Sequence, residues 1–440
     1  MHAVIITDDL AGRASPAIRK VIPSALTPIA GSPLIIRQMR ALARCGVTKL
    51  TVVAGDGVAP LRDIVRAQAR ACGIPAATVE GSQPAFGPLA AVVDAHEDVL
   101  IIEGGVLFDL TIAAVRDFQH ARNALLTVIA HPSLDPRGSP LLREENDLVV
   151  DVIPPNRVDA EDERNLAPTG IYLAAPLLFR HPAIRRAQTM IRDVVPGLIA
   201  AGERVGCYRS SEYVRVIKTQ AHVADAERDI RVGRAETMRL PRRRPAIVFD
   251  CDGVLNEERP PKGTLRPDDV ILVPGAADAV RRARAEGYLT VAITNRPQVA
   301  RGEITFEELD RILGRLEALL AQRGGLLDRI YFCPHHPAPQ CVTKIAELAI
   351  PCDCRKPGPL LFRRALGDLP IDLARSCAIG DSLRDIGAAR AVGLPAFGVR
   401  TGYACADYAR YPGGASAAPI PDRMFADVGA AVDYMLSRKS

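Results

Sequence analysis

Short apolar runs alternate with longer segments of mixed character along the chain. Residues 99–102 and 247–249 contain only apolar side chains, a pattern typical of strands buried on both faces of a sheet. Residues 32–44 and 60–71 instead repeat their apolar positions at helical spacing. Buried strands that alternate with amphipathic helices predict an α/β protein with largely parallel sheets.

The length and the order of these segments predict two domains. A chain of 440 residues commonly folds as two domains, with three as the alternative. We expect an N-terminal domain over residues 1–235, a basic linker over 236–245 and a C-terminal domain over 246–440. In the first domain the pattern predicts strands at 3–7, 49–54, 99–102 and 125–130, and helices at 32–44, 60–71 and 112–120.

Charge and composition narrow the function classes. The chain has 56 Lys and Arg against 51 Asp and Glu, no Trp and 4% aromatic residues. A nucleic-acid binder needs a strongly basic face or stacking aromatics, so we expect no nucleic-acid partner. We interpret the basic run 239–245 as a solvated linker, although it also suits a patch that attracts phosphate.

The sequence also predicts a cytoplasmic protein without a membrane partner. We find no apolar segment of about 18 residues, the length needed to cross a bilayer, and the N-terminus lacks the basic-then-apolar order of a signal peptide. The ten cysteines are scattered and suggest no disulfide framework.

Two carboxylates at the end of one predicted strand carry the strongest chemical signal. Asp250 and Asp252 follow the apolar run 247–249. Residues i and i+2 of an extended segment point the same way, and ligands bind at the carboxyl ends of parallel strands. One Asp can attack phosphorus while the other serves as general acid and base. The alternative is a solvated Asp-x-Asp turn.

Three later segments favour the catalytic interpretation. A second strand, 289–295, ends in Thr294 and Asn295, whose polar groups suit a phosphoryl oxygen. Arg355 and Lys356 supply two cations, and Pro357 suits the start of a helix. A short strand at 378–380 then ends in Asp381, with Asp385 one turn later. This ordered set predicts a phosphotransfer site.

The C-terminal domain resembles the haloacid dehalogenase (HAD) superfamily of phosphatases. Within it, the domain is most similar to heptose 1,7-bisphosphate phosphatases, with histidinol-phosphate phosphatases as the close relatives. The matching stretches are residues 250–256, 294–302, 333–337, 352–357 and 380–385.

This resemblance implies roles for individual residues. It implies Asp250 as the nucleophile, Asp252 as the general acid/base, and Thr294 and Lys356 as ligands of the phosphoryl group. Mg²⁺ would be held by Asp250, the backbone carbonyl of Asp252 and Asp381. The residues implied to orient the sugar or a second phosphate are Asn295, Arg301 and Arg355.

Two departures from the family pattern stand out. Cys251 replaces a usual Arg, and we expect its side chain to face away from the two carboxylates. Residues 296–298, Arg-Pro-Gln, replace a usual Gln-Ser-Gly. This second change lies near the expected substrate position and therefore bears on substrate identity.

Four further residues form a possible metal pattern: Cys333, His335, Cys352 and Cys354. Three thiolates and one imidazole suit a closed, structural Zn²⁺ site. By spacing alone, ordinary thiols beside a surface histidine are an equal alternative. The resemblance to the phosphatases favours zinc. We interpret the neighbouring His336 and Cys341 as bystanders.

The N-terminal domain resembles sugar-1-phosphate nucleotidyltransferases over residues 22–35 and 100–109, and more weakly over 170–172. The residues that carry nucleotidyl transfer in that family are missing, however. The loop 7–13 holds two Asp where a Gly-rich triphosphate loop is usual, and Ser24 replaces a Lys. Gly105 stands where a metal-binding Asp is expected, and no acid is found around Val216, where a second is expected.

We therefore expect this domain to be a degenerate transferase, although Arg13, Arg19 and Lys20 could partly replace the lost cations. The leading hypothesis is a Mg²⁺-dependent phosphatase that removes the 7-phosphate of a heptose 1,7-bisphosphate and contains a structural Zn²⁺. One alternative is a bifunctional phosphatase and heptose-1-phosphate nucleotidyltransferase. Another is a histidinol-phosphate phosphatase whose N-terminal domain binds a nucleotide-sugar or assembles a homo-oligomer.

Overall fold

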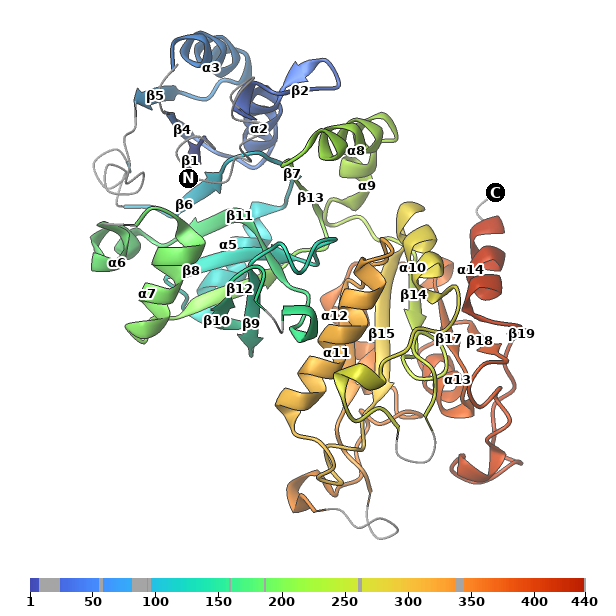
Figure 1. Cartoon of the computed structure of the whole chain (residues 1–440). Helices are drawn as coiled ribbons and strands as arrows, with labels where there is room; N and C mark the ends of the chain where they lie inside the picture. Colours follow the sequence, from blue (N-terminus) through green and yellow to red (C-terminus); the bar gives the residue numbers. More distant parts are fainter. Residues whose placement is uncertain are drawn as a thin grey trace. The chain divides into compact units, whose positions relative to one another are not determined.

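The computed structural model describes residues 1–7, 24–54, 58–80, 93, 96–157, 160–185, 187–259, 263–337 and 344–438. The chain forms two compact units (Figure 1). Unit 1 comprises Met1–His131, Leu142–Ile153 and Leu166–Leu240, and unit 2 comprises Pro132–Leu141, Pro154–Asn165 and Pro241–Ser440. The last boundary, between Leu240 and Pro241, lies inside the segment predicted as the linker.

Unit 1 is built on a nine-stranded sheet in the order β5-β4-β1-β6-β11-β8-β12-β10-β9. The strands are β1 His2–Ile6, β4 Lys49–Ala54, β5 Ala76–Glu80, β6 Val99–Glu103, β8 Leu126–His131, β9 Leu141–Glu145, β10 Leu148–Ile153, β11 Ala167–Ala174 and β12 Val205–Arg209. Strands β5, β4, β1 and β6 are parallel. Because β11 runs antiparallel to β6 and β8, the sheet is mixed.

Helices cover both faces of this sheet. Successive residues of β1 alternate between two apolar clusters, because side chains of a strand point to opposite faces in turn. Ala3 and Ile5 pack with residues of α2, α3 and α5, whereas Val4 and Ile6 belong to the cluster of α6 and α7. The helices of unit 1 are α2 Leu34–Arg44, α3 Val58–Cys72, α5 Ile112–Arg122, α6 Pro182–Arg185, α7 Val195–Ala200, α8 Gln220–Arg231 and α9 Arg234–Met238.

The predicted elements of unit 1 recur with small shifts at their ends. The helix expected from residue 32 begins at Leu34, because the two residues before it form β3, Ser32–Pro33, which pairs with β2, Pro28–Ile29. A second small sheet joins β7, Val106–Asp109, to β13, Tyr213–Val216.

Unit 2 has a six-stranded sheet in the order β16-β15-β14-β17-β18-β19, and all of its pairs are parallel. Its strands are β14 Ala246–Phe249, β15 Leu289–Asn295, β16 Arg329–Cys333, β17 Cys377–Gly380, β18 Ala396–Val399 and β19 Arg423–Phe425. This is the strand order of a doubly wound dinucleotide-binding sheet. The fold class predicted from sequence is therefore confirmed.

Helices also enclose the sheet of unit 2 on both faces. One apolar cluster joins Ile247 and Phe249 to α10, α11 and α14, and the other joins Ala246 and Val248 to α12 and α13. The helices are α10 Ala276–Ala285, α11 Phe306–Ala321, α12 Leu360–Asp368, α13 Leu383–Arg390 and α14 Val428–Ser437. The prediction that Pro357 starts a helix is wrong: a turn closed by Gly358 N–H on Arg355 O (2.7 Å) precedes α12.

Two segments from the N-terminal half of the sequence belong to unit 2. In the second of them, Arg164 Nε donates to Glu317 Oε2 of α11 at 3.0 Å, and the backbone N–H of Asn165 donates to the same oxygen at 2.9 Å. Gly314 is required beneath this segment, because a Cβ at that position would collide with the backbone of Asp162 and Glu163. We call Pro154–Asn165 the arm.

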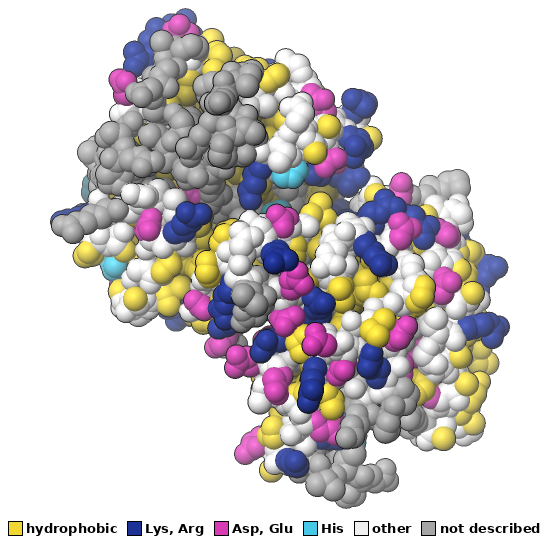
Figure 2. All heavy atoms as spheres, in the orientation of Figure 1, with side chains coloured by type: hydrophobic (Ala, Val, Ile, Leu, Met, Phe, Trp, Pro, Cys, Tyr) yellow, Lys and Arg dark blue, Asp and Glu magenta, His cyan; other side chains and the backbone are white. Residues whose placement is uncertain are grey.

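The surface carries charges of both signs. Figure 2 shows basic and acidic side chains interspersed over the visible face of the described residues. Among the described helices, none combines the length and the apolar character that crossing a membrane requires.

Candidate active site and metal centre

The polar residues predicted from sequence meet at one edge of the unit 2 sheet. Asp250 directly follows β14, Asn295 ends β15, and Asp381 directly follows β17. From the central β14 the chain moves to β15 on one side and later to β17 on the other. Open α/β sheets bind ligands in the crevice that forms where strand order reverses in this way.

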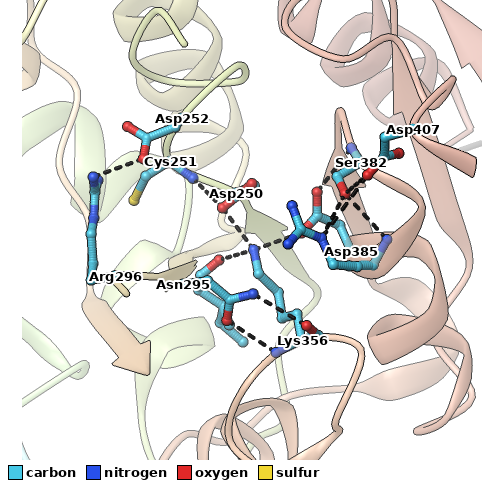
Figure 3. A network of polar contacts seen from close by, with 11 residues as sticks. Asp250, Cys251, Asp252, Asn295, Arg296, Lys356, Ser382, Asp385 and Asp407 are labelled. Carbon is cyan, nitrogen blue, oxygen red and sulfur yellow. Dashed lines mark hydrogen bonds and ion pairs between the residues drawn. The ribbon is translucent and has the colours of Figure 1, made fainter. Parts of the chain in front are cut away.

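Lys356 lies at the centre of the site and is almost completely buried (Figure 3). Its Nζ is 2.7 Å from Asp250 Oδ1, 2.6 Å from Asp385 Oδ1 and 2.7 Å from the carbonyl oxygen of Ile293. Burial acts to lower the pKa of Lys356, but the two carboxylates outweigh it and raise this pKa. The ammonium therefore stays charged beside Asp250.

Three carboxylates converge within 4.8 Å of one another, those of Asp250, Asp381 and Asp385. Burial, followed by repulsion from Asp385, raises the pKa of Asp250 to about 7 even though Lys356 opposes the shift. Burial, followed by repulsion from Asp385 and Asp250, raises the pKa of Asp381 well above its usual range. Three carboxyl groups face one ammonium, and the raised pKa values of Asp250 and Asp381 show that a further cation is needed to keep all three ionised. This oxygen-rich cluster therefore fits a divalent cation such as Mg²⁺.

Two glycines let the backbone approach Asp381 closely. Gly253 and Gly402 both have positive φ, at 83° and 59°, and a Cβ on either would collide with the Asp381 carboxylate. The backbone N–H of Tyr403 donates to Asp381 Oδ2 at 2.7 Å. Asp381 is therefore fixed from several sides.

Asp252 points to a different set of partners. Its Oδ1 accepts from Asn256 Nδ2 at 2.8 Å, and its Oδ2 accepts from Arg296 Nη1 at 2.7 Å. The intervening Cys251 is completely buried in the apolar cluster of α10, α11 and α14. The two carboxylates of the Asp-x-Asp pair thus line one pocket while being held by separate groups.

Asn295 holds the loop that carries Lys356. Its side-chain Oδ1 accepts from the Lys356 backbone N–H at 3.0 Å, and its Nδ2 donates to the Lys356 carbonyl at 3.2 Å. Both polar groups of the amide are therefore engaged by the backbone. The role in orienting substrate that the resemblance implies for Asn295 remains a prediction.

One pocket of about 320 Å³ joins these groups, a size within the range of small-molecule sites. All eight residues predicted to act on substrate or on Mg²⁺ line it: Asp250, Asp252, Thr294, Asn295, Arg301, Arg355, Lys356 and Asp381.

The lining of this pocket also includes three arginines and one histidine: Arg301, Arg355, Arg384 and His336. Burial and the nearby Arg384 lower the pKa of Arg355, and burial and Arg355 lower the pKa of His336. Arg384 and Arg301 thus oppose the charge of Arg355, although Arg301 itself pairs with Glu303 at 2.7 Å. An anionic group of a ligand would relieve this repulsion.

The four predicted zinc ligands also come together. Cys354 Sγ is 3.1 Å from Cys333 Sγ and 3.2 Å from Cys352 Sγ, and His335 Nδ1 is 3.1 Å from Cys354 Sγ. The cysteines are free thiols. A tetrahedral zinc with Zn–S bonds of about 2.3 Å separates its sulfurs by about 3.8 Å, so a small expansion of the cluster suffices. The donor set fits Zn²⁺. Of the two neighbours interpreted as bystanders, His336 lines the pocket and Cys341 lies outside the described residues.

Comparison with known proteins agrees with this geometry. A family model described as HAD-hydrolase-like matches residues 353–431. The D-glycero-beta-D-manno-heptose-1,7-bisphosphate 7-phosphatase of Yersinia pestis is 37% identical over 151 residues, which are 34% of this chain and 77% of that protein. The protein of the same name from Rhodopseudomonas palustris is 36% identical over 35% of this chain and 83% of its own length.

The chain belongs to the heptose-1,7-bisphosphate 7-phosphatase family. It is a HAD-type phosphoric monoester hydrolase. Among solved structures, the D,D-heptose 1.7-bisphosphate phosphatase from B. bronchiseptica, complexed with magnesium and phosphate, is 32% identical over 44% of this chain and 98% of its own, with a TM-score of 0.38. For the N-terminal half, the structural neighbours include HddC from Yersinia pseudotuberculosis, with 13% identity, coverage of 52% of this chain and 99% of that chain, and a TM-score of 0.43.

Some residues of the phosphatase site were not assigned a role from sequence. Asp385 joins the carboxylate cluster and pairs with Lys356. The sequence could have indicated the position of Asp385 in the first turn of a helix, because Ser382 and Asp385 form a capping box at the start of α13. By contrast, Glu258 and Tyr403 enter the pocket from irregular loops, whose course no periodic pattern predicts.

Proposed function

We propose that this phosphatase removes the 7-phosphate of D-glycero-D-manno-heptose 1,7-bisphosphate through an aspartyl-phosphate on Asp250. The observation that carries the proposal is the Asp250 carboxylate, held 2.7 Å from the buried Lys356 ammonium inside the pocket. The names of the curated relatives support the choice of substrate.

The chain's own residues perform two proton-coupled steps. An oxygen of Asp250 attacks phosphorus, the ester P–O bond breaks, and the leaving sugar oxygen takes a proton from Asp252. Asp252 then takes a proton from water, the water oxygen attacks phosphorus, and the bond to Asp250 breaks. Throughout, Lys356 and Thr294 hold the transferring phosphoryl oxygens.

Mg²⁺ would be held by Asp250 and Asp381, with the Asp252 carbonyl as the third protein ligand, and would neutralise charge on the phosphoryl group. Asp385 lies in the same carboxylate cluster. Its contact with Lys356 keeps the ammonium directed at the site.

The arginines of the pocket favour a bisphosphate over histidinol phosphate. Arg301, Arg355 and Arg384 line the same pocket as Asp250. A second phosphate would pair with them, whereas the ammonium of histidinol phosphate would be repelled. The sugar would therefore lie between the cations and the nucleophile.

Phosphate release from three compounds tests this proposal: heptose 1,7-bisphosphate, fructose 1,6-bisphosphate and histidinol phosphate. We expect the highest kcat/KM with the heptose, and a phosphorus NMR spectrum in which the 1-phosphate survives. Faster turnover of histidinol phosphate, or loss of the 1-phosphate, would contradict the proposed substrate.

We also propose a structural Zn²⁺ at Cys333, His335, Cys352 and Cys354. The carbonyl oxygen of His335 accepts from Arg355 Nη1 at 3.2 Å, and Lys356 follows directly in the chain. The metal would thus stabilise the wall that carries both cations. One zinc per chain by metal analysis is the expected result.

For unit 1, we propose that it transfers no nucleotidyl group. Val216 pairs with Val106, and the Ile217 N–H donates to the Gly105 carbonyl at 2.6 Å. The two positions at which the resemblance expects metal-binding acids therefore adjoin, and neither carries a carboxylate. No pyrophosphate should form from a nucleoside triphosphate and heptose 1-phosphate; its formation would refute this point. Binding of a nucleotide-sugar and formation of a homo-oligomer remain predictions.

A further inference from the structure

Arg296 is the most unusual residue of the site. It is 1% exposed, the largest side chain among the fully buried residues described, and it directly follows β15. Its Nη1 donates to Asp252 Oδ2 at 2.7 Å. Burying a guanidinium is costly unless a carboxylate compensates its charge, so the position of Arg296 depends on Asp252.

The hydrogen bond from Arg296 helps to fix the Asp252 carboxyl group, on which the proposed proton transfers depend. Asn256 Nδ2 holds Oδ1 of Asp252 at 2.8 Å, with Thr264 Oγ1 at 3.5 Å, and Arg296 holds Oδ2. Both oxygens are therefore restrained while Asp252 still lines the pocket. The Arg296 backbone is itself fixed, because its N–H donates to the Cys333 carbonyl at 2.7 Å.

The identity of the residue matters. The family pattern usually has Gln at this position, which can donate a hydrogen bond but carries no charge. Arg adds a rigid, charged fork that matches a carboxylate. The buried charge makes any other orientation of the Asp252 carboxyl group unfavourable, because that orientation would leave the guanidinium without its partner.

We propose that Arg296 is a positioning residue, which orients the Asp252 carboxyl group toward the leaving oxygen of the substrate. This inference rests on the proposed function, in which Asp252 is the general acid/base. A misaligned acid slows esters with poor leaving groups most. Positioned proton transfer of this kind typically contributes about 10²–10⁴-fold to rate.

The test compares two substrates with full-length Arg296→Gln. The sugar phosphate needs its leaving oxygen protonated, whereas the leaving group of p-nitrophenyl phosphate needs little protonation. We expect kcat/KM for the sugar phosphate to fall about 10–100-fold, with less than about threefold change for p-nitrophenyl phosphate. Arg296→Lys should restore part of the loss, because it restores the charge.

A double mutant separates this role from a structural one. In an Asp252→Asn background, Arg296→Gln should cause no further loss of kcat, because a residue acting through Asp252 has nothing left to position. Equal losses with both substrates, or a further loss in the Asp252→Asn background, would overturn the inference. An inactive wild-type enzyme would instead overturn the proposed function and the inference with it.

Discussion

Lys356 Nζ lies between Asp250 Oδ1 at 2.7 Å and Asp385 Oδ1 at 2.6 Å. One buried ammonium thus contacts the proposed nucleophile on one side and the first turn of α13 on the other. This arrangement links the loop that carries Lys356 to the end of β14 and to the start of α13. It brings residues from distant motifs together in one pocket.

Replacement of Lys356 tests this link. We expect Lys356→Ala to lower kcat by at least about 100-fold, the scale observed when a group that stabilises transition-state charge is removed. Lys344 lies outside the described pocket lining, so Lys344→Ala serves as the control. Near-normal turnover in Lys356→Ala would contradict the role of this ammonium.

The raised pKa of Asp250 predicts a pH dependence of stability without Mg²⁺. A carboxyl with a folded-state pKa of about 7 binds a proton more readily in the folded state than in the unfolded state, where its pKa is about 3.9. Stability contributed by this group therefore decreases as the pH rises from about 4 to about 7 and stays reduced above that.

This effect is measurable by thermal unfolding in Mg²⁺-free buffer at pH 6.0 and 8.5. Relative to Asp250→Asn, the wild-type protein should lose stability between the two values, and Mg²⁺ should raise its melting temperature more at pH 8.5. An identical pH dependence for wild type and variant would contradict the assignment.

Two adjacent histidines, His335 and His336, provide a matched pair of variants that tests the zinc proposal. His335→Ala should lose the metal and unfold at a lower temperature, because structural zinc contributes folding free energy. His336→Ala should keep about one zinc per chain, because this side chain lies outside the Cys/His cluster. Equal zinc content in the two variants would show that His335 is not a ligand.

The ion pair between Arg164 of the arm and Glu317 of α11 should stabilise unit 2. Arg164→Ala leaves Glu317, 8% exposed, without its guanidinium partner, and should destabilise the phosphatase unit by about 2–4 kcal/mol. Arg311 forms a more exposed pair with Asp162 at 3.5 Å, so Arg311→Ala should cost less than about 1 kcal/mol. Equilibrium denaturant unfolding, followed by phosphatase activity, measures both changes in the free energy of unfolding. Equal effects would argue against a buried arm contact.

Much of the site is predictable from local patterns, because a strand end places its polar residues by itself. Asp250, Thr294 and Asp381 each follow or end an apolar run, and parallel strands bring such ends to one edge. The Cys/His pairs likewise suggest a metal cluster, although their spacing alone leaves ordinary thiols as an equal alternative. The sequence therefore predicts the eight lining residues that were assigned to substrate or Mg²⁺, but not Glu258 or Tyr403.

Other features depend on long-range packing and are not predictable in this way. The antiparallel course of β11 does not follow from its apolar run, because a buried strand has the same pattern in either direction. Nothing local pairs Arg296 with Asp252, or places Arg164 against Glu317. The assignment of residues 132–141 and 154–165 to unit 2 arises from such contacts as well.

The proposed mechanism requires that a phosphoryl group becomes covalently attached to Asp250. Reaction with heptose 1,7-bisphosphate, quenched by acid within milliseconds and followed by peptide mass spectrometry, measures this directly. We predict that the peptide containing residues 247–256 gains one phosphoryl group at Asp250, and that Asp250→Asn shows none. Full turnover with no phosphorylated Asp250 in the quenched enzyme, or with the label on another residue, would contradict it.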